Sequence, residues 1–357
     1  MDNTDRTETG YSTSLLRRAA LLAVLFAGGV VFLGAYTRLV DAGLGCPDWP
    51  GCYGHVLWPT EAGEIAAAEA AFPDAPVDLS KTWPEMVHRY FAGTLGLIIL
   101  GFAAWAVRGR GRPDAPPLGL SLLLLAMVIL QGAFGAWTVT LKLWPQVVTA
   151  HLLGGFTTLS LLWLLCLRTG ALGEPQRFGV PAQLLPHAVL ALVAVVLQIA
   201  LGGWVSSNYA ALACPDLPTC HGAWVPPMDL EAGFDVTQSV GPNYLGGLLE
   251  NEARVAIQYV HRVGALVVAA LVGALVWRLF QAGSRLAAPV GLVLAAQLTL
   301  GVLNVVLKLP LWSATLHNAV GALTLLALVT VNYAAVYRRR GPEPATLRSL
   351  PGRPVAA

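Results

Sequence analysis

The stretch QGAFGAWTVTLKLWPQVVTAH, residues 131–151, recurs 166 positions later as QLTLGVLNVVLKLPLWSATLH, residues 297–317. Each copy contains the end of one apolar run, a short segment around a lysine, and the start of the next apolar run. The copies share a glutamine, a glycine, a lysine, a threonine and a histidine in register. This pattern predicts two apolar helices joined by a turn, built twice in one chain.

Two further motifs repeat in the same order. GCPDWPGCYG, residues 45–54, matches ACPDLPTCHG, residues 213–222, at a shift of 168. MVHR, residues 86–89, matches YVHR, residues 259–262, at a shift of 173. Chance similarity would not keep three motifs in one order at nearly constant shifts. The sequence therefore indicates an internal duplication.

The composition indicates that lipid surrounds these helices. Of 357 residues, 56% are hydrophobic and only 12% are charged, whereas soluble domains have about 25% charged residues. Continuous apolar runs favour membrane-spanning helices over a barrel, whose strands would alternate. We predict an all-α integral membrane protein in which residues 1–175 and 176–357 form tandem four-helix bundles with pseudo-two-fold symmetry. The eight predicted spans are residues 16–39, 83–107, 117–139, 146–168, 183–205, 254–280, 286–307 and 312–337.

Basic residues predict the orientation of the helices. Most arginines lie at the same ends of the predicted spans as Arg108, Arg278 and Arg338. We therefore expect both termini in the cytoplasm and the long loops 41–82 and 206–253 on the extracytoplasmic side. The N-terminal segment shows neither a cleavable signal pattern nor a transit-peptide pattern, so we expect a bacterial plasma membrane. The formal net charge of +2 reflects topology and does not indicate nucleic-acid binding.

Four of the seven histidines occupy matched positions in the two halves. Each lies a few residues into its predicted helix from the outer end, where an ionisable residue is a functional candidate. Zinc usually takes more than two protein ligands, whereas two imidazoles suit haem iron, whose other four ligands come from the porphyrin. We therefore predict two bis-histidine haem sites, one formed by His88 and His151 and the other by His261 and His317.

The two halves differ in the polar residues near these histidines. Glu85 lies one helical turn before His88, whereas its counterpart is Gln258. Arg38 corresponds to Ser206. A carboxylate beside a porphyrin can accept a proton or stabilise positive charge, which an amide cannot do. We predict that the N-terminal pocket is catalytic. The alternative is that Glu85 lies in water near the N-terminus of its helix, where a negative charge is favourable.

Arg89 and Arg262 directly follow a histidine of each half. Two roles stay open for them. Their guanidinium groups either bind haem propionates near the membrane interface or extend to lipid headgroups.

Two cysteine pairs, Cys46 with Cys52 and Cys214 with Cys220, keep the same spacing. On the predicted outer side, disulfides persist, which favours two disulfides over one zinc site built from both pairs. Whether the first disulfide is structural or also redox-active stays open. Cys166 lies toward the cytoplasmic end of its predicted helix, so we interpret it as a buried apolar residue and not as a haem thiolate.

The motifs GCPDWPGC, EMVHR, TAH, CPDLPTC, YVHR and TLHN together resemble those of the haem A synthase family, from about residue 34 to 321. The resemblance implies an enzyme that oxidises the C8 methyl group of haem O to a formyl group by successive hydroxylation, giving haem A for terminal oxidases. It also implies that oxygen comes from water and that a carboxylate stabilises a carbocation-like intermediate.

The same resemblance implies roles for the candidate residues. His261 and His317 would hold haem b, and His88 and His151 would engage the substrate haem O. Glu85 matches the essential carboxylate of the family. The first cysteine pair would be a candidate relay for reducing equivalents.

Two other classes of function remain. A membrane haem carrier or exporter could use the same pockets without altering the haem. A b-type electron-transfer protein would hold two permanent haems, although four histidines near one face argue against electron transfer across the membrane. The expected partners are haem O or haem A and membrane lipid, with haem O synthase, an unidentified electron acceptor and a second copy of the chain as candidates.

Overall fold

The computed structural model describes residues 3–112 and 114–340. These residues form helices, turns and loops with no β-strand, and eight of the helices are long and apolar enough to cross a membrane. The predicted all-α fold with eight spans is therefore confirmed. The eight helices are α1 (Asn3–Leu39), α3 (Leu79–Arg108), α4 (Leu118–Thr140), α5 (Pro145–Arg168), α6 (Leu185–Ser207), α8 (Asn251–Gln281), α9 (Ala287–Val306) and α10 (Leu311–Arg340).

Four short elements lie outside these helices: α2 (Ala62–Ala71), α7 (Leu230–Gly233), η1 (Pro175–Phe178) and η2 (Ala182–Leu184). Neither α2 nor α7 was predicted, because a short helix in a polar loop has no membrane-length apolar run. The α3 helix also begins four residues earlier than predicted. There, Asp78 accepts a hydrogen bond of 3.0 Å from the backbone N–H of Ser80 and caps the helix.

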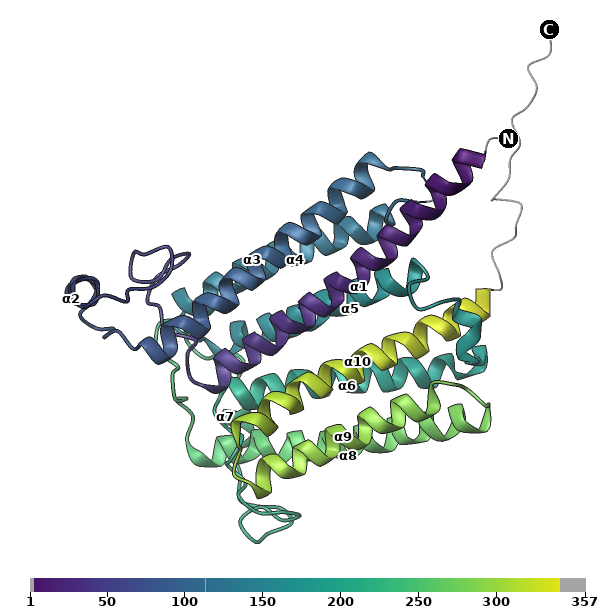
Figure 1. Cartoon of the computed structure of the whole chain (residues 1–357). Coiled ribbons are helices and arrows are strands. Elements are labelled where there is room, and N and C mark those ends of the chain that lie inside the picture. Colours follow the sequence, from purple (N-terminus) through teal and green to yellow (C-terminus); the bar gives the residue numbers. More distant parts are fainter. Residues whose placement is uncertain (1–2, 113, 341–357) are drawn as a thin grey trace.

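The eight helices pack as two groups of four (Figure 1). In the first group, α1 and α4 each pack against both α3 and α5, and in the second, α6 and α9 each pack against both α8 and α10. The groups meet through α1 with α10, α5 with α6, and α5 with α10. Equivalent helices make equivalent contacts, as a duplication predicts. The pseudo-two-fold axis and the halves 1–175 and 176–357 remain predictions, and residues 1–2, 113 and 341–357 lie outside the described residues.

The loop backbone repeats as well. All eight non-glycine residues with positive φ in the described ranges fall into four pairs that are 166 or 168 positions apart. Positive φ is uncommon for residues other than glycine, so its recurrence at matched positions shows that the turns have the same shape in both halves. The pairs are Asp41 and Tyr209, Tyr53 and His221, Lys142 and Lys308, and Leu143 and Leu309.

The buried apolar residues form a main core and smaller clusters, and the layer of His88, His151, His261 and His317 lies between them. The main core lies toward the end of the bundle that carries both ends of the described chain, and it includes Leu162, Cys166 and Leu328. Cys166 is a free, fully buried thiol there, as predicted. Smaller apolar clusters at the opposite end contain the four other cysteines. Along α3, His88 lies between Met86 of a smaller cluster and Leu95 of the main core, and along α8, His261 lies between Ile257 and Val268 in the same way.

Candidate functional site

Each candidate histidine of the N-terminal half packs against a glycine of the neighbouring helix. His88 on α3 lies against Gly34 of α1, where an added Cβ atom would be 2.8 Å from Cε1 of the imidazole. His151 on α5 lies against Gly135 of α4, with a corresponding distance of 3.5 Å. A side chain at Gly34 would displace the ring of His88, so glycine is needed for this close approach.

The C-terminal half repeats this arrangement. His261 on α8 lies against Gly202 of α6, and His317 on α10 lies against Gly301 of α9. In both cases an added Cβ atom would be 3.3 Å from Cε1 of the imidazole. Each half therefore brings its two histidines in from opposite sides of a four-helix group.

A glutamine one turn before the glycine lies beside the histidine at two of these positions. Gln198 Nε2 lies 3.1 Å from His261 Nδ1 and donates a hydrogen bond of 2.8 Å to the carbonyl of His261. Gln297 Nε2 lies 3.2 Å from His317 Nε2. Gln198 was not predicted as a site residue, although a Q-x-x-x-G pattern links it to Gly202 and recurs at residues 131–135 and 297–301.

The N-terminal half departs from this pattern in α1. The counterpart of Gln198 is Val30, which cannot donate a side-chain hydrogen bond. The Nδ1 atom of His88 is buried without a hydrogen-bond partner. His88 therefore lacks the side-chain amide that lies beside His261.

The donor set fits a haem. Besides His88, the rings of His151 and His317 carry a buried Nδ1 atom without a partner, so these imidazoles are not fully used by the protein. Among residues 3–112 and 114–340, no group of three or more His, Cys, Asp or Glu side chains could hold a metal ion. Two imidazoles approaching from opposite sides suit an iron whose remaining ligands come from a porphyrin.

Glu85 is buried beneath the first cysteine loop. Its side chain has little access to solvent, since the residue is only 4% exposed. One carboxylate oxygen accepts a 2.9 Å hydrogen bond from the backbone N–H of Cys46, and the other forms a 2.5 Å ion pair with Arg89. This environment excludes the alternative of a solvated carboxylate. The counterpart Gln258 is also buried, and its side-chain oxygen has no partner.

The two arginines that follow the histidines bind the cysteine loops. Arg89 donates through Nη1 to the carbonyls of Asp48 and Gly51, at 3.0 and 2.5 Å. Arg262 donates to the carbonyls of Asp216 and Cys214, at 2.8 and 2.6 Å. Each guanidinium group therefore joins a histidine-bearing helix to the loop above it. Binding of propionates by Arg89 and Arg262 remains a prediction.

Both predicted disulfides are confirmed. Cys46 is bonded to Cys52 and Cys214 to Cys220, with S–S distances of 2.05 and 2.04 Å. The four sulfur atoms are thus engaged in two local links at the end of the bundle opposite the termini of the described chain. The zinc site considered as an alternative would need these thiols free.

An aspartate inside each loop holds its backbone. Asp48 accepts hydrogen bonds from the N–H groups of Tyr53 and Gly54, at 2.6 and 2.8 Å. Asp216 accepts from the corresponding groups of His221 and Gly222, at 2.6 and 2.9 Å. The hydroxyl of Thr219, followed by these N–H groups, lowers the pKa of Asp216 to about 2.

The loop that precedes α8 crosses to the N-terminal half and covers the α4–α5 turn. Trp144 Nε1 donates to the carbonyl of Gln238 at 2.9 Å, and the backbone N–H of Tyr244 donates to the carbonyl of Lys142 at 3.0 Å. In the C-terminal half, the corresponding α9–α10 turn leaves Trp312 53% exposed. Among the described residues, the turn beside His151 is therefore covered by a loop of the other half, and the turn before α10 is not.

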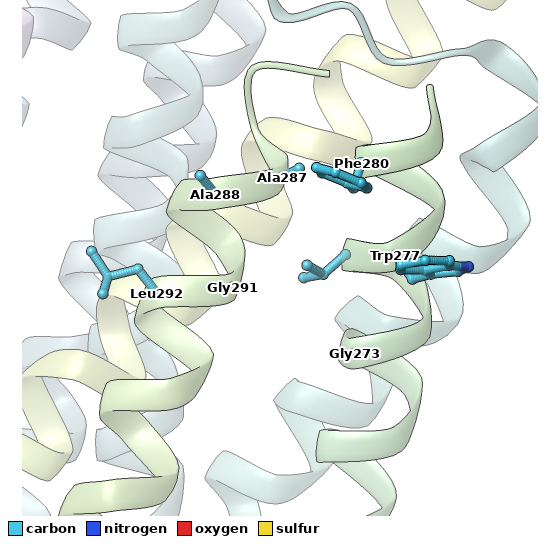
Figure 2. Close-up of a pocket in the computed structure, with 8 residues that line it drawn as sticks. Gly273, Trp277, Phe280, Ala287, Ala288, Gly291 and Leu292 are labelled. Carbon is cyan, nitrogen blue, oxygen red and sulfur yellow. The ribbon is translucent and has the colours of Figure 1, made fainter. Parts of the chain in front are cut away.

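An apolar groove of about 450 Å³ lies between α8 and α9 (Figure 2). Gly273, Trp277 and Gly291 are among its lining residues. Gly273 lies twelve residues beyond His261, which places the groove roughly 18 Å or more from the histidine layer along α8. The groove has no charged lining residue and does not belong to the candidate site.

Comparisons with known proteins agree on one family. The model of the cytochrome oxidase assembly protein family, COX15-CtaA, matches residues 17–329. The chain is 46% identical over 327 residues to the heme A synthase of Shewanella oneidensis, covering 90% of this chain and 96% of that protein. It is 34% identical over 360 residues to the heme A synthase of Methylobacterium radiotolerans, covering 92% and 90% of the two chains.

Proposed function

The chain belongs to the cytochrome oxidase assembly protein family, and from this premise we propose that it is a haem A synthase, which oxidises haem O to haem A. The observation that carries the proposal is the 46% identity to a heme A synthase over 90% of the chain. Two histidine pairs in an eight-helix membrane protein support it, because each pair suits a haem iron.

We assign the substrate haem O to His88 and His151, and a resident haem b to His261 and His317. Two observations support this division. The amide of Gln198 holds His261, as expected where a haem stays bound. A buried carboxylate lies one turn from His88, where the reaction needs a group that accepts protons.

Glu85 is the proposed catalytic residue. Oxidation of a methyl group to a formyl group with oxygen from water releases protons and electrons. A carboxylate can accept those protons or stabilise positive charge that develops on the substrate. Arg89 and the backbone of Cys46 fix its two oxygen atoms, so the group is oriented before substrate binds. A bound haem b would supply one-electron redox chemistry next to this pocket.

The proposed location is the bacterial cell membrane, with the cysteine loops on the extracytoplasmic side and both termini in the cytoplasm. The distribution of arginines supports this orientation. Haem O synthase is the proposed donor of the substrate, since haem O is poorly soluble in water. An electron acceptor must also bind, and self-association of the chain is a further proposal.

The proposal is tested by extracting the haems from the purified protein and separating them by chromatography. We expect hydroxylated or formylated haem beside haem b and haem O. We expect Glu85→Gln to reduce conversion of haem O by roughly 10²- to 10⁴-fold while haem stays bound. Glu231→Gln, at an exposed position of α7, is the control.

Three outcomes would change the proposal. Normal conversion by Glu85→Gln would remove the catalytic role of Glu85. A wild-type protein that binds haem O but never contains an oxidised product would favour the haem carrier. Two permanently bound b haems without any haem O would favour the electron-transfer protein.

A further inference from the structure

Arg38 lies at the junction of the two halves, in the last turn of α1. It follows Gly34 by four residues, so both lie on the same face of the helix, about 6 Å apart along the axis. Gly34 is the residue that contacts His88. Arg38 therefore lies one turn outward of the N-terminal histidine layer.

The side chain of Arg38 reaches the C-terminal half. Its Nη2 donates a 2.5 Å hydrogen bond to the carbonyl of Ser206 on α6, and its guanidinium carbon lies 4.1 Å from the ring centroid of Tyr209. Ser206 follows Gly202 by four residues, and Gly202 contacts His261. The guanidinium group is thus one turn outward of both histidine layers.

This guanidinium group retains a donor for a ligand. The side chain of Arg38 is 17% exposed, and its Nε atom is buried without a hydrogen-bond partner. Its Nη1 forms a 3.3 Å ion pair with Asp41, which is half exposed. Arg262 also has an unpartnered Nε, but three carbonyls of its cysteine loop occupy its Nη atoms. A buried donor without a partner is costly, and a carboxylate is the anion that best matches a guanidinium group.

We propose that Arg38 binds a haem propionate at the junction between the two pockets. This inference rests on the proposed function, because a propionate enters the protein only as part of a haem. Charged propionates avoid the apolar core, so in a haem held at the histidine layer they extend toward the outer end. Arg38 lies in that direction from both layers. Its counterpart is the uncharged Ser206, so the duplicated protein has one such cation at this junction.

The test compares two probes in a titration followed by haem absorbance. Ferric protoporphyrin IX carries both propionates, whereas its dimethyl ester carries no carboxylate. Full-length protein from haem-depleted cells is titrated as wild type, as Arg38→Gln and as Arg38→Lys. Arg108→Gln, at the opposite end of the bundle, is the control.

We expect Arg38→Gln to weaken binding of the free acid by about 10-fold or more and to leave binding of the ester unchanged, because a charge-assisted hydrogen bond is lost. Arg38→Lys should restore part of the affinity for the free acid. Equal weakening for both probes would mean that Arg38 only supports the fold, and no weakening for either would mean that it does not bind the propionate. Either result overturns the proposal.

Two further arms identify the pocket. In a His261→Ala background only the N-terminal pocket can hold a haem, and in a His88→Ala background only the C-terminal pocket can. In one background, Arg38→Gln should still weaken binding of the free acid more than binding of the ester. The pocket that remains in that background holds the haem whose propionate Arg38 binds. If neither background shows this difference, the proposal is overturned. The titration needs no turnover, so a wild-type protein that forms no haem A would refute the proposed function and leave this result standing.

Discussion

At the end of the bundle that carries the cysteine loops, the two halves have the same backbone conformation and differ in their polar side chains. At three matched positions the N-terminal half has Val30, Arg38 and Glu85, and the C-terminal half has Gln198, Ser206 and Gln258. The four histidines, their four glycines and the two disulfides are the same in both. The two halves thus share the histidines, glycines and disulfides that suit two haems. They differ in a few side chains near the histidines.

The halves also differ in what covers them. The loop before α8 is bonded to the α4–α5 turn near Trp144, whereas the matching turn near Trp312 has no such cover among the described residues. A loop of the C-terminal half therefore covers the turn that precedes His151 in the N-terminal half. Among the described residues, no loop of the N-terminal half is hydrogen-bonded to the α9–α10 turn in return.

The largest expected effect comes from removing one histidine of each pair. We expect His261→Ala to lose almost all haem b, by more than about 100-fold in affinity, because loss of an axial ligand exceeds the effect of losing an outer-shell contact. His88→Ala should keep haem b and lose binding of haem O. Haem content is measured by absorbance and chromatography, with His187→Ala as the control. Loss of haem b from His88→Ala alone would reverse the assignment of the pockets.

Removing either disulfide should lower the free energy of unfolding by the same amount. Both loops have the same length, so Cys46→Ser with Cys52→Ser and Cys214→Ser with Cys220→Ser should each lower the free energy of unfolding by about 2 kcal/mol. Thermal unfolding in detergent measures this. Turnover separates the two loops further. Full turnover in both double variants would exclude a redox role and leave two structural links. A loss of haem O oxidation confined to the first would show that this loop is needed for the reaction, through its sulfur atoms or through the hydrogen bond from Cys46 to Glu85.

Replacing Gln198 by valine, the residue at the matching position of the N-terminal half, tests whether the amide beside His261 strengthens haem binding. We expect Gln198→Val to weaken haem b binding by about 10-fold, because a residue that orients a metal ligand typically contributes that much. The midpoint potential of haem b should change as well, which loss of folding stability alone would not cause. Haem titration and redox potentiometry measure both. Unchanged values would mean that packing against Gly202 suffices to orient the imidazole.

The smallest expected effect is the pH dependence of the stability contributed by Asp216 in the second cysteine loop. The hydroxyl of Thr219 and nearby N–H groups lower the pKa of Asp216 to about 2. The stabilisation from this carboxylate is therefore fully present above its unfolded pKa of about 3.9, and it is lost only as the pH falls toward 2. Between pH 5 and 8 we expect a constant difference in thermal stability between wild type and Asp216→Asn. A difference that changes within this range would contradict the assignment.

The sequence by itself determined the eight helices, the repeated motifs, the matched positions of the four histidines and the two cysteine pairs. These features are local or periodic. A membrane requires long apolar runs, and repeated motifs such as GCPDWPGC and ACPDLPTC appear directly in the order of residues. The burial of Cys166 followed from its apolar surroundings.

Only the tertiary structure decided which residues meet. The contact of His88 with Gly34, the hydrogen bonds from Arg89 to the first cysteine loop and the bond from Arg38 to Ser206 join different helices or loops. Arg38 is hydrogen-bonded to Ser206, which lies 168 positions later in the sequence and is its counterpart in the C-terminal half. Periodicity identifies the face on which a residue lies, but the partner across that face depends on how separate helices pack together.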